Sequence, residues 1–263
     1  MQVTYKRREL IFSALLAAGL GALPVVAQSQ AVLGAMINSA GRNRMHAQRL
    51  ARNYAQLLLE IEPAAARQQL AQSLSEVSGT LDVLARNPLN PAVHSAQKNA
   101  QLSFDALKSL MQSPPSRDKL VAVNSAAEVF FATSNALALA LQEFAQQKTA
   151  KLTNDAGAQR PRVMRLAKCY LMDLAGLTLS DEVRATKAQF EQVHADLMQA
   201  AESSKLVRGQ LDLVKIQFGF IATALDTRVA ETNKFARAAV STSERVVELM
   251  DEVVKAYALQ VKA

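Results

Sequence analysis

The stretch INSAGRNRMHAQRLARNY, Ile37 to Tyr54, decides how the rest of the sequence is interpreted. It is rich in alanine, glutamine and arginine, which favour helix. Four arginines fall within eleven residues, at Arg42, Arg44, Arg49 and Arg52, and the stretch contains no acidic residue. A buried arginine is costly unless another charge neutralises it. We therefore expect the compensating charge to come from another helix or from a bound anion.

The composition is that of an all-helical protein. Of the 263 residues, 50% are hydrophobic, only 9 are glycine and 7 proline, and tryptophan is absent. The net charge of +7 is spread along the chain. This argues against a nucleic-acid partner and favours an anionic ligand or a membrane surface. Cys169 is the only cysteine, so we expect a buried, inert thiol and no internal disulfide.

Residues 1–27 are expected to be an export signal. A positive segment, MQVTYKRRE, precedes the apolar LIFSALLAAGLGALPVV, and Val25 and Ala27 form a small-residue cleavage site. The Arg7-Arg8 pair resembles a twin-arginine signal. The alternative is an uncleaved anchor, because the apolar run is just long enough to cross a bilayer. No later segment is expected to cross one, so the mature protein is expected to be soluble and periplasmic, and membrane-bound only if the signal is uncleaved.

Turn signals divide the remaining chain into eight helical stretches. Pro63 ends the first, NPLNP (87–91) the second and SPPS (113–116) the third. The fourth, from about Arg117 to Thr149, carries an apolar seam whose steps of three and four residues are typical of near-parallel packed helices. The seam consists of Leu120, Val123, Ala127, Phe130, Ser134, Leu137, Leu141 and Phe144. Four helices with short loops predict an up-down-up-down bundle.

The pattern then starts again. We call the stretch from Ile37 to Tyr54 the first box, and TNDAGAQRPRVMRLAKCYL, which begins at Thr153, aligns with it at an offset of 116 residues. The matched pairs are Asn38 and Asn154, Ala40 and Ala156, Gly41 and Gly157, Arg44 and Arg160, Arg49 and Arg165, and Tyr54 and Tyr170. The last helix repeats the seam at Ala236, Ala239, Ser243, Val246, Met250, Val253 and Tyr257. Near it, Ala122, Val123 and Val129 align with Ala239, Val240 and Val246 if one residue is added. This tandem duplication predicts two tandem up-down four-helix bundles, at 28–150 and 151–263.

The string N-x-A-G-x-x-R-M-x-x-Q-R-x-A resembles the signature of the PilJ-type domain. That domain is the N-terminal sensor of type IV pilus methyl-accepting transducers and is related to the sensors of the NarX and NarQ nitrate/nitrite kinases. The matching residues are Asn38, Ala40, Gly41, Arg44, Met45, Gln48, Arg49 and Ala51. The resemblance implies a four-helix bundle that pairs with a second copy. For nitrate-sensing members, the resemblance also implies that arginines of this box hold one anion between the first helices of two subunits.

The residues of the box also suit an anion on chemical grounds. Gly41 lies one helical turn before Arg44, so a ligand or partner helix can approach the backbone there. A guanidinium is planar and presents a fork of donors that matches a small planar oxyanion. The candidate ligand-binding residues are Arg44, Arg49, Gly41, Asn38 and Gln48, with Arg160, Arg165 and Gly157 as candidates in the second copy.

Other residues of the two boxes are given structural roles. Pro161 replaces Met45 and is expected to kink or restart the second helix, which makes the first copy the better site. Arg42, Arg52 and His46 are expected to face solvent.

The sequence contains no recognisable catalytic set. The three histidines are scattered, and metal-ligand spacing, haem attachment and phosphate-loop motifs do not occur. We therefore expect no enzyme activity, no catalytic residue, no metal ligand and no cofactor.

Two functions are expected from these observations. The first is a periplasmic sensor or binding protein for a small oxyanion, nitrate or nitrite first, acting as a homodimer or with a separate signalling protein. A partner is expected because the signalling regions that usually follow such a sensor do not appear in the sequence. The alternative is a helical interaction or scaffold module, linked to type IV pilus or chemosensory assembly, that binds no ligand.

The two units are expected to stack end to end, although side-by-side pairing remains open. The connecting stretch QQKTAKLTNDAGAQRP (146–161) holds one glycine and a late proline, which is thin evidence for a fold-back loop. With stacking, a two-fold anion site would require a second molecule.

Overall fold

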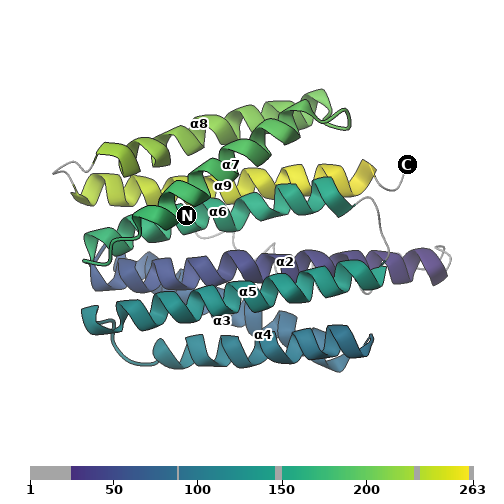
Figure 1. The fold of residues 1–263 in the computed structure, drawn as a ribbon, viewed down its shortest axis with the longest axis horizontal. Helices are drawn as coiled ribbons and strands as arrows, with labels where there is room; N and C mark the ends of the chain where they lie inside the picture. Colours follow the sequence, from purple (N-terminus) through teal and green to yellow (C-terminus); the bar gives the residue numbers. More distant parts are fainter. Residues whose placement is uncertain (1–24, 88, 146–149, 228–231, 261–263) are drawn as a thin grey trace, which may run out of the picture.

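The computed structural model describes residues 25–87, 89–145, 150–227 and 232–260, and these residues are all-α, as predicted. Within them the helices are α2 (Val25–Leu58), α3 (Pro63–Arg86), α4 (Pro91–Leu110), a 3-10 turn (Arg117–Lys119), α5 (Leu120–Ala145), α6 (Ala150–Leu174), α7 (Ser180–Gln199), α8 (Lys205–Thr227) and α9 (Thr232–Gln260) (Figure 1). Almost all of the expected export signal lies outside the described residues.

Local sequence sets the helix ends. Pro63 and Pro91 each open a helix, where the missing proline N–H would have had no partner in any case. Asn90 caps α4, because its side chain accepts a hydrogen bond of 2.8 Å from the Val93 amide. Pro161, in contrast, lies inside a continuous α6. The predicted restart of the helix at Pro161 is therefore wrong.

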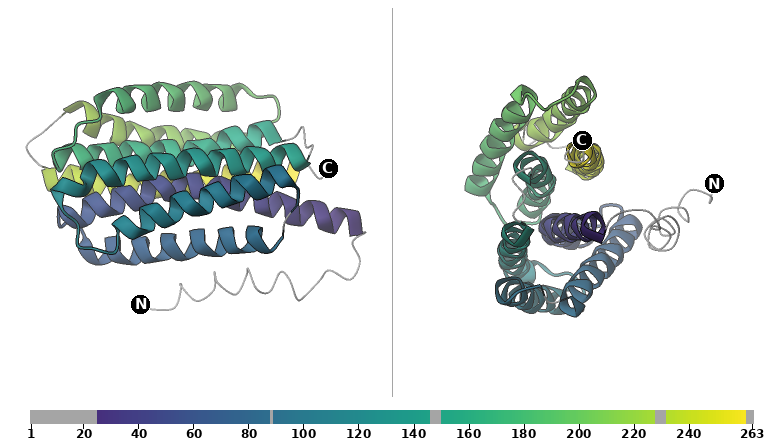
Figure 2. Two further views of the ribbon diagram at one scale, coloured as in Figure 1. Left: turned by 60° about the horizontal axis from the view of Figure 1, so that its bottom comes forward. Right: turned by 90° about the vertical axis from the view of Figure 1, so that its right-hand side faces the viewer.

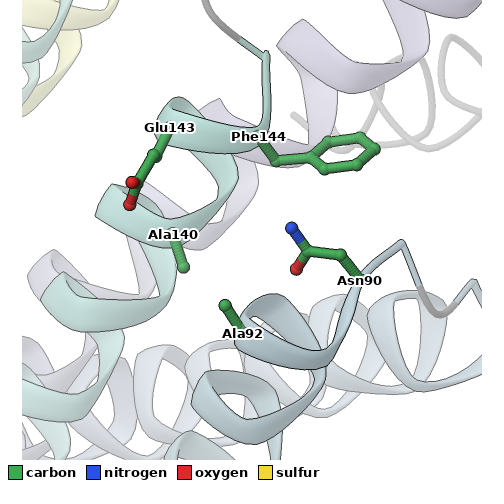
Figure 3. A pocket seen from close by; sticks show the side chains of 5 residues that line it. All are labelled: Asn90, Ala92, Ala140, Glu143 and Phe144. Atoms are coloured by element: carbon green, nitrogen blue, oxygen red, sulfur yellow. The ribbon is translucent and has the colours of Figure 1, made fainter.

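The seams of α5 and α9 are buried, with one exception. Phe144 is 39% exposed and lines a surface pocket of about 340 Å³ beside Asn90 (Figure 3). The burial pattern also corrects the repeat register. Phe130 and Val246 are both fully buried, whereas Val129 is 55% exposed. The offset of 116 residues therefore holds throughout the last helix, and the extra residue introduced in the alignment is wrong.

One helix satisfies the length and composition of a membrane span. The segment Arg117–Ala145 is apolar enough, which contradicts the expectation that no later segment would be. Its seam packs against α2 and α4 in the core. Among the described residues it is the only such segment, and a core helix passes the same test.

The first helices of the two repeats, α2 and α6, lie side by side (Figures 1 and 2). Helix α2 also packs against α3 and α5, and α6 against α7 and α9. End-to-end stacking is therefore wrong. That prediction considered only the connecting segment, whereas the pairing is decided by the faces of α2, which carry buried residues all round.

The hydrophobic cores cross the repeat boundary. Met45 of α2 belongs to the core built mainly from α6–α9. Tyr170, Leu171 and Met172 of α6 belong to the core built mainly from α2–α5. The division at residue 150 therefore describes the sequence repeat, and as a domain boundary it stays a prediction.

Candidate functional site

Helix α2 carries most of its polar residues into the interior. Arg44 is 6% exposed and Arg52 is 0% exposed. His46 is also buried, and Arg42 keeps only part of its side chain in solvent. The prediction that Arg52 and His46 face solvent is wrong, because α3, α5 and α6 surround the helix.

Arg44 and Arg160 each form a hydrogen bond between α2 and α6. Arg44 Nη2 donates to Asn154 Oδ1 at 3.2 Å, and Arg160 Nη1 donates to Asn38 Oδ1 at 3.3 Å. Each arginine therefore reaches the asparagine of the other repeat. Because the offset of 116 residues relates both the two arginines and the two asparagines, the two contacts form a pseudo-two-fold pair. We call this the asparagine–arginine cluster: Asn38, Gly41 and Arg44 of α2, Asn154, Gly157 and Arg160 of α6, Asn135 of α5 and Asp251 of α9.

Two glycines make room for the Arg44 guanidinium. A Cβ atom added at Gly41 would lie 3.4 Å from Arg44 Nη2, and one added at Gly157 would lie 3.9 Å from the same atom. The guanidinium thus occupies the space that larger side chains would fill on both helices. At Gly41 the neighbouring atom belongs to Arg44 of the same helix, so the approach of a ligand or partner helix to the backbone there stays a prediction.

The two halves of the cluster differ in charge. Arg160 Nε lies 2.9 Å from Asp251 Oδ1, and Arg42 Nη1 lies 2.9 Å from Asp251 Oδ2. At the matching position, Arg44 Nη1 donates to the neutral Asn135 Oδ1 at 2.8 Å. Among the described residues, no carboxylate forms an ion pair with Arg44.

The pKa of Arg44 lies below its ordinary value. Burial, together with the positive charges of Arg160 and Arg162, lowers it to about 10. The guanidinium stays protonated at neutral pH. It is therefore a buried cation held by neutral acceptors, the arrangement that a small anion would complete.

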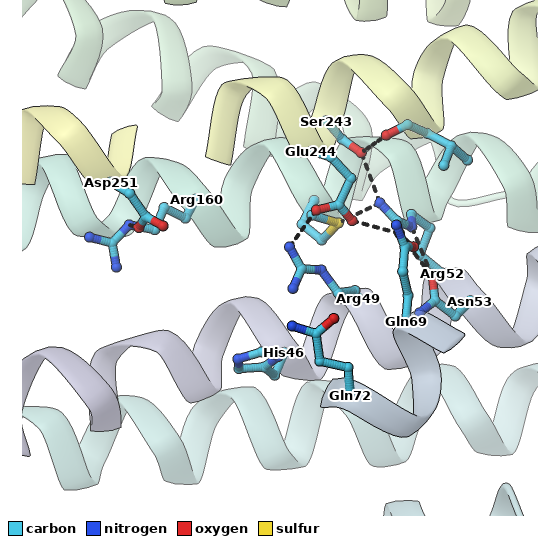
Figure 4. Close-up of polar contacts among 12 residues, drawn as sticks. His46, Arg49, Arg52, Asn53, Gln69, Gln72, Arg160, Ser243, Glu244 and Asp251 are labelled. Carbon is cyan, nitrogen blue, oxygen red and sulfur yellow. Dashed lines mark hydrogen bonds and ion pairs between the residues drawn. The ribbon is translucent and has the colours of Figure 1, made fainter. Parts of the chain in front are cut away.

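One to two turns along α2 and α6, a second group of cations is neutralised within the protein. We call it the carboxylate cluster: Arg49 and Arg52 of α2, Arg165 and Lys168 of α6, Glu128 of α5, Glu182 of α7 and Glu244 of α9. Arg49 and Arg52 both pair with Glu244, the latter at 2.8 Å (Figure 4). In the matching arrangement, Arg165 pairs with Glu128. Each first helix is thus bound to the fourth helix of the other repeat.

Further contacts complete the carboxylate cluster. Lys168 Nζ lies 2.7 Å from both Glu128 Oε1 and Glu182 Oε1, and Gln48 Nε2 donates to Glu128 Oε1 at 3.0 Å. Burial raises the pKa of Glu128, but the charges of Lys168 and Arg165 outweigh burial, and the pKa falls below its ordinary value. The pKa of Glu244 is lowered in the same way. These carboxylates are ionised partners of the arginines.

His46 pairs with Glu76 of α3 instead of joining the asparagine–arginine cluster. Its Nε2 lies 3.1 Å from Glu76 Oε2. Burial lowers the pKa of His46, and the hydrogen bond from His46 lowers the pKa of Glu76 to about 2. The pair is therefore a neutral imidazole donating to a carboxylate.

Two surface pockets are lined by residues outside both clusters. The larger has a volume of about 530 Å³ and is lined by residues of α6, α7 and α8 that include Cys169 and Lys187. Cys169 is buried, as predicted, and burial raises its pKa to about 12, so the thiol is inert. In the described part of the chain, no group of three or more histidine, cysteine or acidic side chains has metal-binding geometry.

The structure divides the predicted site residues into two sets. It brings Asn38, Gly41, Arg44, Gly157 and Arg160 together. It places Gln48, Arg49 and Arg165 with carboxylates instead. Sequence reasoning missed the partners of these residues, which are Asn135, Asn154 and Asp251 in one cluster and Glu128, Glu182, Glu244 and Lys168 in the other. Four of these partners are related by the repeat. The offset of 116 residues relates Glu128 to Glu244 and Asn135 to Asp251, and this correspondence is the signal in the sequence that could have identified them.

Comparison with known protein families gives a match in the first part of the chain. Residues 25–138 match the family described as the type IV pili methyl-accepting chemotaxis transducer N-terminal domain, PilJ. No curated protein and no solved structure matches the chain. The match includes the first arginine box and helices α2 to α4 with most of α5. The second copy and the relation to NarX and NarQ stay predictions.

Proposed function

We propose that this chain, whose residues 25–138 are a PilJ domain, is a helical interaction module of a type IV pilus or chemosensory assembly. The observation that carries the proposal is the carboxylate cluster. Of the four arginines in the first box, Arg42, Arg49 and Arg52 already form ion pairs with α9. Most of the arginines of the box therefore form ion pairs that join the two repeats. This favours a rigid scaffold over a sensor whose arginines are unpaired until a ligand binds.

Pairing of α2 with α6 inside one chain supports the same function. The resemblance implies that first helices pair between subunits, whereas here both come from one molecule. A module that completes this pairing internally needs no second subunit for it. Its outer helices remain available for a signalling protein, such as a type IV pilus methyl-accepting transducer.

Binding to a transducer tests this function directly. We expect the purified chain to bind the periplasmic domain of a type IV pilus methyl-accepting transducer from the same organism in isothermal titration calorimetry. Deletion of the gene should alter pilus-dependent twitching without slowing growth. Absence of binding together with unchanged twitching would refute the interaction module.

A small oxyanion at Arg44, nitrate or nitrite first, is the second candidate function. It rests on the buried guanidinium that faces Asn135 where Arg160 has Asp251. An anion bound only to the native state at a hundred times its dissociation constant stabilises the protein by about 2.7 kcal/mol. We therefore expect nitrate, but not chloride at equal ionic strength, to raise the melting temperature if this function is correct.

The repeat supplies a matched variant for that test. Asn135→Asp gives Arg44 the carboxylate that Arg160 already has, and should stabilise the fold while abolishing the gain from nitrate. Arg44→Gln should abolish the same gain. If nitrate still raises the melting temperature of both variants, the anion binds elsewhere. If nitrate does not raise the melting temperature of the unsubstituted protein, only the interaction module remains as a proposed function.

We further propose export to the periplasm with cleavage after Ala27. Mass spectrometry of periplasmic protein should then find a chain that begins at Gln28. A full-length product in the membrane fraction would show that the apolar segment is an anchor.

A further inference from the structure

Helix α8 carries a continuous apolar stripe on its exposed side. Leu206, Leu213, Ile216 and Phe220 are 71%, 46%, 57% and 59% exposed. Together with Gly209 they follow steps of three and four residues along 21 Å or so of helix, the spacing of a helix-pairing seam. The opposite side of α8 packs mainly against α9, so α8 presents two apolar sides and only one is covered (Figures 1 and 2).

The corresponding helix of the first repeat lacks this stripe. The buried positions of α4 and α8 correspond in pairs: Val93 and Val207, Ala100 and Val214, Phe104 and Phe218, and Leu107 and Ile221. In this register the stripe of α8 matches Ala92, Ser95, Asn99, Leu102 and Ala106 of α4. Only Leu102 is large and apolar. The stripe is therefore not required by the fold that the two repeats share.

Gly209 has no role within the molecule that would explain it. A Cβ atom at this position would meet no atom within 4 Å. Glycine inside a helix costs roughly 0.5–1 kcal/mol relative to alanine, and here no close contact offsets that cost. A gap in the middle of an exposed apolar stripe suits a large side chain from another helix.

We propose that α8 pairs with α8 of a second copy of this chain, in antiparallel orientation. With the two-fold axis between residues 214 and 215, Leu213 lies opposite Ile216 of the other copy. Gly209 then lies opposite Phe220, so the largest side chain of the stripe fills the gap left by the smallest. In a parallel pair Phe220 would meet Phe220 and the two glycines would leave a void. The stripe is thus complementary to itself in the antiparallel register.

The charges beside the stripe agree with this register. Lys205 and Asp226 flank its two ends, and the antiparallel register brings Lys205 of each copy beside Asp226 of the other. Asp226 remains largely exposed even though it accepts an ion pair from Lys187. The parallel register offers Lys205 no acidic partner at the corresponding position, which is Gln210. Charge complementarity therefore selects a second copy in the antiparallel orientation, and this inference does not depend on the proposed function.

Sedimentation velocity of the full chain tests the pairing. We expect a concentration-dependent dimer, and Leu213→Glu/Ile216→Glu should raise its dissociation constant at least ~100-fold by placing carboxylates in the apolar seam. The matched control is Leu102→Glu, an exposed leucine (69%) at the position of α4 that corresponds to Ile216. It should leave the dimer unchanged. Circular dichroism should show the same helicity in all variants, because the substituted side chains are exposed.

Charge exchange tests the orientation. Lys205→Glu and Asp226→Lys should each weaken the dimer by roughly 2- to 30-fold, since two exposed ion pairs are lost. The double variant Lys205→Glu/Asp226→Lys should recover most of the loss. A wild-type chain that stays monomeric at about 100 µM, a dimer that survives Leu213→Glu/Ile216→Glu, or a double variant without recovery would each overturn the proposal.

Discussion

Arg52 shows how a charged side chain is held in the core of this protein. Its guanidinium is fully buried and reaches Glu244 at 2.8 Å, Gln69 at 2.7 Å and Ser243 at 3.0 Å. A buried charge with these partners is stable, but each partner loses its compensation if the arginine is removed. Arg44 differs because all of its acceptors are neutral.

We predict that Arg52→Ala destabilises the protein by about 3–5 kcal/mol, because it leaves buried polar groups without a partner and a cavity in the core. Arg245→Ala, which removes an exposed pair with Glu248, should cost no more than about 1 kcal/mol. Urea unfolding followed by circular dichroism measures both values. Equal losses for the two variants would contradict the assignment of Arg52 to the core.

His46 and Glu76 predict a fall in stability on acidification. The pKa of His46 is lowered from 6.5 by burial, so the unfolded chain binds its proton first as the pH falls below 6.5. The pKa of Glu76 is lowered from 4.5 to about 2, so its contribution is present above pH 4.5 and is lost towards pH 2. Both changes favour the unfolded state at low pH.

Between pH 6.5 and 5, His46→Gln should therefore reduce the slope of the free energy of unfolding against pH. One protonating group contributes at most about 1.4 kcal/mol per pH unit. His194, whose pKa is also lowered by burial, retains its own contribution of the same sign in this variant. Urea titrations at several pH values measure the slope, and identical slopes for wild type and His46→Gln would show that His46 is not the group responsible.

At the scale of elements, the pairing of α2 with α6 depends on small residues beside large ones. Gly41 and Gly157 leave the space that the Arg44 side chain occupies. A glycine in a helix is normally a cost, so its presence here reflects what lies beside it. Gly79 of α3 has no neighbour within 4 Å of an added Cβ and carries no such constraint.

We predict that Gly41→Leu destabilises the protein by roughly 1–3 kcal/mol, because the added side chain must displace the guanidinium from the helix pair. Gly79→Leu should instead stabilise it by roughly 0.5–1 kcal/mol through helix propensity alone. Thermal melting of the two variants beside wild type checks the opposite signs. Stabilisation by both substitutions would mean that the Arg44 guanidinium does not pack beside Gly41.

At the scale of the whole molecule, ion pairs and shared hydrophobic cores hold the two repeats together. Ion pairs run from α2 to α9 and from α6 to α5. Met45 packs in the second core, and Tyr170 packs in the first. Contacts of this kind couple the stability of one repeat to that of the other.

We therefore expect the full chain to unfold in a single cooperative transition in urea. Residues 1–149 expressed alone should be far less stable, because α2 would expose Met45, Arg49 and Arg52 without their partners. Circular dichroism and tyrosine fluorescence should give coincident midpoints for the full chain. Two separate transitions, or a first half as stable alone as in the full chain, would indicate independent domains.

Much of this fold could be predicted because its signals are local. Pro63 and Pro91 open helices wherever the rest of the chain goes, and the spacing of three and four residues identifies the seams of α5 and α9. The box from Asn38 to Ala51 indicated the family that residues 25–138 match. Each of these signals operates within a few turns of one helix, so the sequence alone contains it.

Only the tertiary structure decided which helices share a face. Arg49 meets Glu244 across 195 residues and Arg44 meets Asn154 across 110, and no local pattern encodes such distances. Arg52 was expected to be solvated, yet α9 supplies the carboxylates of Glu244 and Asp251 that compensate the buried cations of α2. End-to-end stacking failed for the same reason. The short connecting segment contributes little free energy, whereas the side-by-side arrangement brings the buried cations of α2 and α6 to the carboxylates of α5, α7 and α9.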